Sequence, residues 1–143
     1  MNRIEQLKPL SREHHLSLVL ANKAIKTAKN EDVVAIEQLC QQIADDFEDR
    51  WEAHFAKEEQ TLFTPFENNY QHDLKAEEAG LSLMLREQHD RMREMARDMQ
   101  TGRVDQLAEF GQLLKEHTRL EERLFFPLVS ELFTEEELNF IEH

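Results

Sequence analysis

Two stretches of the sequence each place a histidine four residues before a pair of glutamates. Both read His-x-x-x-Glu-Glu, followed by an apolar pair and a proline, and they begin at His54 and His117. On an α-helix, residues four apart lie on one face, so each stretch offers an imidazole and a carboxylate together. The carboxylates are those of Glu58 and Glu121. Imidazole with carboxylate, without thiolate, suits iron, manganese or zinc. Each stretch therefore presents half of a metal site.

Long helices are needed to position these stretches, and the composition favours them. Gly and Pro number three each, while residues that lose little freedom in a helix are frequent. Apolar residues three or four apart predict helices over residues 11–29, 32–64, 74 or 80 to 100, and 104 to near 127. Ser11 is the expected N-cap of the first helix, and Pro65 the expected end of the second. A capping box from Thr134 to Glu137 predicts a short terminal helix.

These elements predict an all-α fold. Four long amphipathic helices joined by short connections favour an up-down-up-down four-helix bundle, here with a short C-terminal helix. Residues 1–143 are expected to form a single domain. The two halves resemble each other, since each has a helix with a histidine near one end and then a helix that carries His-x-x-x-Glu.

Histidine and glutamate interrupt the predicted apolar faces of three helices. These faces read Ile36, Cys40, Ile43, Phe47, Trp51, His54, Glu58 and Leu62; Leu81, Leu85, His89, Met92, Ala96 and Met99; and Leu107, Phe110, Leu114, His117, Glu121, Leu124 and Leu128. Polar groups buried in a bundle destabilise it unless something satisfies them. The first helix is expected to contribute a sixth polar side chain, so the polar side chains of four antiparallel helices should meet at one depth. Six such side chains suit two bridged metal ions better than one tetrahedral zinc.

The first helix offers a choice between His14 and His15. Apolar residues four, seven and eleven positions further on share the face of His14, whereas the face of His15 carries Asn22 and Lys26. His14 is therefore the predicted ligand. His15 is the alternative, or supports the ligands from outside.

With these positions, the sequence resembles the hemerythrin-like domains, often called HHE cation-binding domains. The resemblance extends from Leu10 through both His-x-x-x-Glu-Glu stretches to the terminal helix. It implies a non-haem site with two iron ions, joined by an oxo or hydroxo group; manganese and zinc are less favoured. Carried over by position, the metal ligands would be His14, His54, Glu58, His89, His117 and Glu121, with Glu58 and Glu121 as bridging carboxylates.

The sequence departs from the oxygen-carrying hemerythrins at two positions. Those proteins carry a His-x-x-x-His pattern in the third helix, whereas this chain has Arg93 four residues after His89. Their last motif has an aspartate five residues after its histidine, where this chain has Glu122. Fewer histidines leave more coordination positions open. The resemblance is therefore closer to family members linked to iron sensing, iron–sulfur repair, or peroxide or nitric oxide chemistry.

Three functions follow as hypotheses. The first is a di-iron protein that binds or senses oxygen, nitric oxide or peroxide at an open iron position. The second is a di-iron enzyme that reduces peroxide, oxidises iron or repairs iron–sulfur clusters, and it needs a proton donor, for which Tyr70 is only a remote candidate. The third, a metal-free helical scaffold, is disfavoured by the doubled motif. A ferritin-like site is excluded because no histidine has glutamate three residues before it.

Charge and cysteine content limit the partners and the compartment. A net charge of -13 argues against nucleic acid and anionic membranes, which need a basic face. The one cysteine, Cys40, excludes an internal disulfide. Together with the lack of a long apolar run or a signal-peptide pattern, it predicts a cytoplasmic protein. The oligomeric state stays open, a homodimer included.

Several further residues are predicted to be structural. His72 and His143 are expected to be ordinary surface or hydrogen-bonded residues, and Glu59 and Glu122 to lie at the edge of the site or on the surface. Flexible core packing is expected for Met84, Met92, Met95 and Met99.

Overall fold

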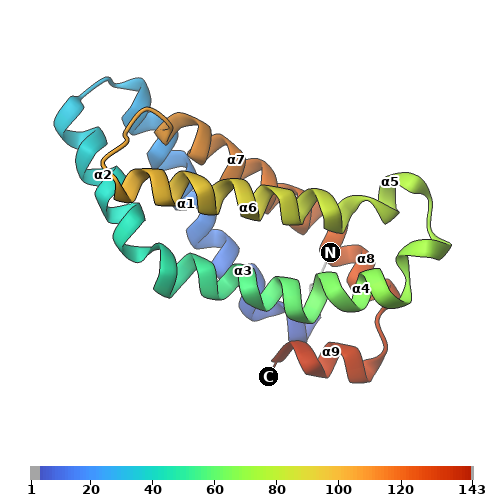
Figure 1. The fold of residues 1–143 in the computed structure, drawn as a ribbon. Helices are drawn as coiled ribbons and strands as arrows, with labels where there is room; N and C mark the ends of the chain where they lie inside the picture. The colour runs from blue at the N-terminus through green and yellow to red at the C-terminus, as the bar shows by residue number, and fades with distance from the viewer. Residues whose placement is uncertain (1–3, 143) are drawn as a thin grey trace.

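The computed structural model describes residues 4–142 of the chain, and this part consists of helices joined by short turns, with no β-strand within it. The predicted all-α class is therefore confirmed. Four long helical runs lie alongside one another, and a shorter helix lies at one end of them (Figure 1). No helix in residues 4–142 combines the length and the apolar character needed to cross a lipid bilayer.

The first run is α1 (Lys8–Lys29), entered through the 3-10 turn η1 (Glu5–Leu7). The prediction that Ser11 caps this helix is wrong, because the helix begins one turn earlier. Pro9 occupies its first turn, where a missing N–H leaves no carbonyl unsatisfied. The Ser11 hydroxyl instead donates to Glu122 at 2.8 Å.

The second run continues from Val33 to Asn69 and contains two wide π-helical turns. Its parts are α2 (Val33–Asp46), η2 (Phe47–Glu52), α3 (Ala53–Glu58), η3 (Glu59–Phe63) and α4 (Thr64–Asn69). The prediction that Pro65 ends this helix is wrong. In η3 the Thr64 N–H donates to the Glu59 carbonyl, five residues back, so Pro65 falls in the first turn of α4. Proline is tolerated in that position.

The third run follows the short turn η4 (Gln71–Asp73) and consists of α5 (Ala76–Ala79) and α6 (Leu81–Gln100). All six residues of the predicted inward face of α6 are buried, which confirms that face. Met84 was expected in the core but is 50% exposed, because it lies at the side of α6, about a quarter turn from the centre of the buried face. Gly102 ends the run with a φ of 96°, a conformation that glycine adopts without strain.

The fourth run contains α7 (Leu107–Leu120), the π turn η5 (Glu121–Phe125) and α8 (Phe126–Leu132). The prediction that Leu124 faces inward is wrong, since 54% of it is exposed. The wide turn holds more residues than an α-turn and therefore moves the inward face to Phe125, which is fully buried.

The terminal helix α9 (Glu135–Glu142) begins with the predicted capping box. The Glu137 N–H donates to the Thr134 hydroxyl at 3.2 Å, and the Thr134 N–H donates to the Glu137 carboxylate at 2.9 Å. Both orphan N–H groups are thereby satisfied, which confirms the prediction.

Two apolar clusters occupy the bundle on either side of a polar layer. The first apolar cluster comprises Ala21, Ala24, Leu39, Cys40, Ile43, Ala44, Phe47, Trp51, Phe55, Met92, Met95, Ala96, Met99, Leu107, Phe110 and Leu114. The second apolar cluster comprises Leu7, Leu10, Leu62, Phe63, Phe66, Leu81, Leu85, Phe125, Phe126, Leu128, Val129, Phe133, Leu138 and Ile141. In each of the four runs, the predicted metal ligands lie between residues of the two clusters.

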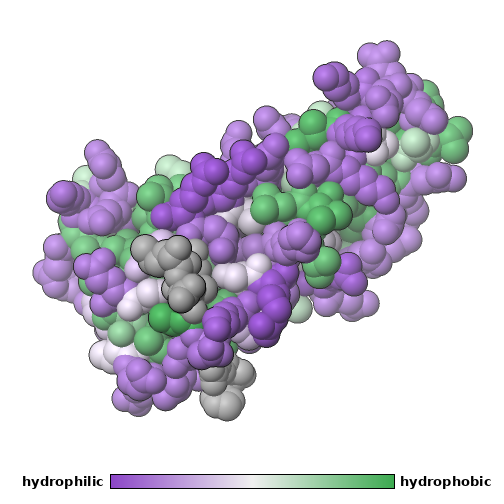
Figure 2. Space-filling view, turned by 180° about the vertical axis from the view of Figure 1, so that it is seen from behind, coloured by the Kyte–Doolittle hydropathy of each residue, from purple (hydrophilic) through white to green (hydrophobic). Residues whose placement is uncertain are grey.

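The helices pack in two close pairs, α1 with α7 and α2 with α6. Gly111 permits the first approach, since a Cβ there would meet the Ala21 carbonyl oxygen at 2.8 Å. Outside these contacts, Figure 2 shows a largely hydrophilic face with separate apolar areas.

Candidate metal centre

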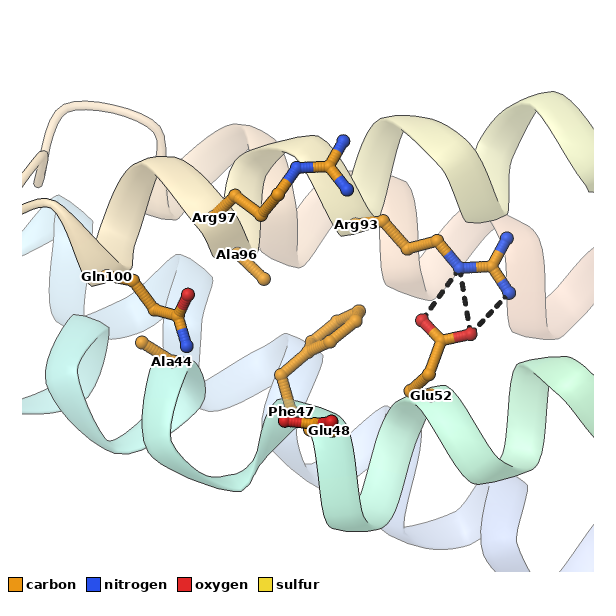
Figure 3. Close-up of a pocket in the computed structure, with 8 residues that line it drawn as sticks. All are labelled: Ala44, Phe47, Glu48, Glu52, Arg93, Ala96, Arg97 and Gln100. Atoms are coloured by element: carbon orange, nitrogen blue, oxygen red, sulfur yellow. Dashed lines mark hydrogen bonds and ion pairs between the residues drawn. The ribbon is translucent and has the colours of Figure 1, made fainter.

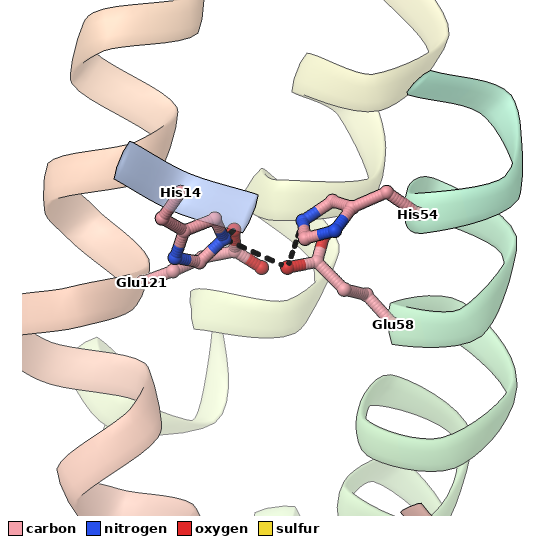
Figure 4. A group of neighbouring side chains, drawn as sticks. All are labelled: His14, His54, Glu58 and Glu121. Carbon is pink, nitrogen blue, oxygen red and sulfur yellow. Dashed lines mark hydrogen bonds and ion pairs between the residues drawn. The ribbon is translucent and has the colours of Figure 1, made fainter. Parts of the chain in front are cut away.

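The six predicted metal ligands lie together in the polar layer, and each is at most 4% exposed. They form two groups that share Glu58 and Glu121. The first group adds His14 and His54, as Figure 4 shows, and the second group adds His89 and His117. Within each group the ligand atoms lie within 4.8 Å of one another. Four helical runs thus deliver imidazoles and carboxylates to one depth.

Glu58 faces both pairs of histidines with its two carboxylate oxygens. Its Oε2 lies 3.2 Å from His14 Nε2 and 3.1 Å from His54 Nε2. Its Oε1 lies 3.0 Å from His89 Nε2. Around an ion with ligands at about 2.1 Å, donor atoms at right angles lie about 3 Å apart. These spacings therefore suit a carboxylate shared by two cations.

Glu121 provides a separate test of whether the site fits a metal. Its Oε1 lies 3.0 Å from His14 Nε2 and 3.1 Å from His117 Nε2. Neither carboxylate oxygen has a hydrogen-bond partner among the residues that the structure describes, because the nearby nitrogens do not approach in hydrogen-bonding geometry. A buried carboxylate in this state is unfavourable. A cation between Glu121 and the histidines would satisfy it, so the donor atoms fit a metal.

Each histidine of the centre directs Nε2 inward and Nδ1 outward to a polar side chain of a neighbouring helical run. The Nδ1 contacts are His14 to Glu122 at 2.8 Å, His54 to Glu13 at 3.1 Å, His89 to Glu59 at 2.7 Å and His117 to Gln88 at 2.7 Å. These four contacts form a closed ring around the bundle. They join the first run to the second, the second to the third, the third to the fourth, and the fourth to the first. With the proton on Nδ1, each Nε2 keeps the lone pair that a metal requires.

Two members of this outer ring, Glu13 and Gln88, were missed by the sequence analysis. Each directly precedes a ligand histidine, so its side chain points toward the adjacent helix instead of the core. Glu59 and Glu122 were expected at the edge of the site or on the surface; both are partly buried and contact ligand histidines, so they lie at the edge. The signal that could have identified all four was the pseudo-repeat. Polar residues recur directly before the lone histidines and directly after the motif glutamates.

A family model that describes the hemerythrin HHE cation-binding domain matches residues 6–129. The chain belongs to the hemerythrin family. The match confirms the resemblance seen in the order of the motifs. Searches among curated proteins and among solved structures gave no match. Family membership and the buried histidine–glutamate cluster together identify a metal-binding protein.

Aromatic rings enclose the centre of this hemerythrin domain. Phe55 stacks on His89 with ring centroids 4.0 Å apart, and Phe126 stacks on His14 at 5.1 Å. Phe63, of the second apolar cluster, also lies against His89, with ring centroids 5.4 Å apart. These contacts restrict the rotation of the imidazoles and keep bulk water away from them. A position prepared in this way loses little conformational freedom when a cation binds.

The charges of the hemerythrin centre attract cations. Burial alone would lower the pKa of His14, His54 and His117, but the carboxylates outweigh it. The pKa of His54 is raised to about 10 by Glu58 and Glu13, and that of His117 to about 9 by Glu121 and Glu58. Burial raises the pKa of Glu58, yet the surrounding histidines hold it well below its usual range. Without metal, the centre therefore holds protons where a metal would otherwise provide the positive charge.

Arg93 stands where oxygen-carrying hemerythrins are expected to have a further histidine. Its guanidinium pairs with Glu59 at 2.8 Å and with Glu52 at 2.7 Å. The Glu52 pair lies at one end of a groove of about 330 Å³ between α6 and the second run (Figure 3). An arginine in these pairs remains charged and donates no lone pair to a metal. The second group therefore has two histidines, as the first group has.

The remaining histidines lie away from the centre. His15 is exposed on α1, about 100° around the helix from the buried His14, so the structure brings His14 and not His15 to the other ligands. The side chain of His72 is 65% exposed, as predicted. His143, also predicted to lie on the surface, is outside the described residues.

Tyr70 does not face the ligands. Its hydroxyl donates to Glu137, and its ring stacks on Phe133 of the second apolar cluster. The remote suggestion that it donates protons at the centre therefore has no support from its position.

Proposed function

We propose that this hemerythrin domain binds two iron ions and that an open coordination position on them binds or senses oxygen, nitric oxide or peroxide. The first group would hold one ion and the second group the other. The observation that carries this proposal is the placement of two buried carboxylates, Glu58 and Glu121. Each lies within 3.2 Å of histidine nitrogens from both groups.

Iron is favoured by the donor atoms and by the family. Each group provides two imidazoles and the shared carboxylates, and no thiolate. Iron sites that combine histidine with carboxylate leave coordination positions for exogenous ligands. When bound, iron supplies reversible ligand binding and electron transfer with small oxidants, chemistry that amino-acid side chains lack.

The protein residues have defined tasks in this proposal. The outer ring holds each imidazole in the tautomer that presents Nε2, and Phe55, Phe63 and Phe126 limit access of water. Binding is favoured over catalysis because Tyr70, the one tyrosine of the chain, is engaged by Glu137. The proposal includes an up-down-up-down bundle, supported by the tight turns that follow α1 and α6.

Anaerobic iron loading tests the proposal. We expect two irons per chain by elemental analysis, and new absorption bands after separate additions of oxygen, nitric oxide or peroxide. His14→Ala should lose most of the iron, whereas the matched variant His15→Ala should keep it, since that side chain is exposed on the same helix. Stoichiometric iron in His14→Ala would contradict the ligand assignment. Steady-state consumption of peroxide would instead support the enzyme hypothesis.

A further inference from the structure

The outer ring consists of Glu13, Glu59, Gln88 and Glu122. Its two halves differ at one pair of positions that are equivalent in the pseudo-repeat. Glu13 directly precedes His14 in the first half of the pseudo-repeat, and Gln88 directly precedes His89 in the second half. Each accepts a hydrogen bond from a histidine of the next helical run, Glu13 from His54 at 3.1 Å and Gln88 from His117 at 2.7 Å. The same position is thus a carboxylate in one half and a neutral amide in the other.

This difference changes how strongly the two histidines bind a cation. An imidazole whose Nδ1–H donates to a carboxylate is a more basic donor at Nε2 than one that donates to an amide. Glu13 also brings a negative charge to the first group. The amide of Gln88 is neutral and adds no charge to the second group.

The second group contains a further contact that weakens its donors. Glu59, which accepts from His89, also pairs with Arg93 at 2.8 Å. A carboxylate shared with a guanidinium attracts the imidazole proton less strongly, because Arg93 already compensates part of its charge.

We propose that the two metal positions of this domain are inequivalent. The first group binds its divalent cation before the second group and more tightly, because its outer partner is the carboxylate of Glu13 where the second group has the amide of Gln88. The inference rests on the proposed two-metal function. Since exchange of an outer hydrogen-bond partner changes metal affinity by about 10- to 100-fold, the difference should be measurable.

Stepwise addition of cobalt(II) to the full chain, stripped of metal by a chelator, tests this order. Calorimetry gives the two binding constants, and visible absorption follows the filling of each position. We expect a first constant about tenfold or more above the second, beyond the statistical factor. Equal site constants in the wild-type chain would overturn the inference and leave the two-metal function intact. Failure to bind any cobalt would instead overturn the two-metal function.

Exchange of the two side chains assigns the steps to the groups. Glu13→Gln should lower the first constant by about tenfold and leave the second nearly unchanged. Gln88→Glu should raise the second constant by a similar factor and leave the first. In the variant that combines Glu13→Gln with Gln88→Glu, the two binding constants should become equal, or the second should exceed the first. Glu87→Gln is the matched control, since it makes the same change at an exposed position next to Gln88 and should alter neither constant. A fall in the second constant of Glu13→Gln, with the first unchanged, would overturn the inference.

Discussion

The apolar clusters and the polar layer of this bundle are stabilised by different forces. In the clusters, burial of a side chain such as Phe110 or Phe125 contributes about 1.5–3 kcal/mol whatever else is bound. In the polar layer, two glutamates and four histidines are buried, and their burial is unfavourable unless charges balance. The clusters therefore hold the helices together, while the layer depends on positive charge from protons or from a bound cation.

The largest effect expected from this difference is at Glu121. Glu121→Ala should lower bound iron from two per chain to well below one, because both groups lose a shared ligand. The helices should persist, since both apolar clusters are untouched and alanine favours helix. Elemental analysis and far-ultraviolet circular dichroism measure the two results.

The matched control for this variant is Glu116→Ala, which removes an exposed carboxylate from α7. It should retain both irons. Two irons in Glu121→Ala would contradict the shared-ligand assignment. Loss of helix in that variant would show that the polar layer is needed for folding and not only for metal binding.

The polar layer could be predicted from the sequence because it follows helical periodicity. His54 and Glu58, or His117 and Glu121, must share a face whenever the segment is helical, and apolar neighbours mark that face as inward. The structure brings all six predicted ligands together, although their role as metal ligands remains a prediction. His89 could be placed in the same way, from the apolar residues on either side of it.

The parts that could not be predicted depend on features outside a regular α-helical repeat. Pro65 and Leu124 were misplaced because wide turns shift the register directly after each His-x-x-x-Glu motif. A pattern search at a period of 3.6 residues does not detect such turns. Glu13 and Gln88 were missed for another reason, since a residue beside the inward face reaches its partner only across the gap to a neighbouring helix.

A second difference between the layer and the clusters should appear in the pH dependence of stability. In the metal-free folded chain, the pKa of His54 is about 10 and that of His117 about 9, whereas the ordinary histidine value is 6.5. The folded state thus binds these protons more tightly than the unfolded state. Their stabilisation is fully present below about pH 6.5 and is lost as pH rises through 9 to 10.

Urea unfolding at pH 6.5, 8 and 9.5, with and without two equivalents of cobalt(II), measures this effect. Metal-free stability should fall by at most about 1.4 kcal/mol per pH unit for each group. The loaded chain should lose less, because a metal on Nε2 replaces the proton. Metal-free stability that rises over this range would show that these histidines are neutral in the folded chain.

The smallest expected effect is at Leu124, beside the layer but on the outside of the wide turn. Because it is 54% exposed, Leu124→Ala should change the free energy of unfolding by about 0.5 kcal/mol or less. Its neighbour Phe125 is fully buried in the second apolar cluster, so Phe125→Ala should cost about 3–5 kcal/mol. Urea denaturation of both variants measures the contrast. A large loss in Leu124→Ala with a small one in Phe125→Ala would mean that a regular α-helix continues through residues 121–125, and that the inward face follows the simple periodicity.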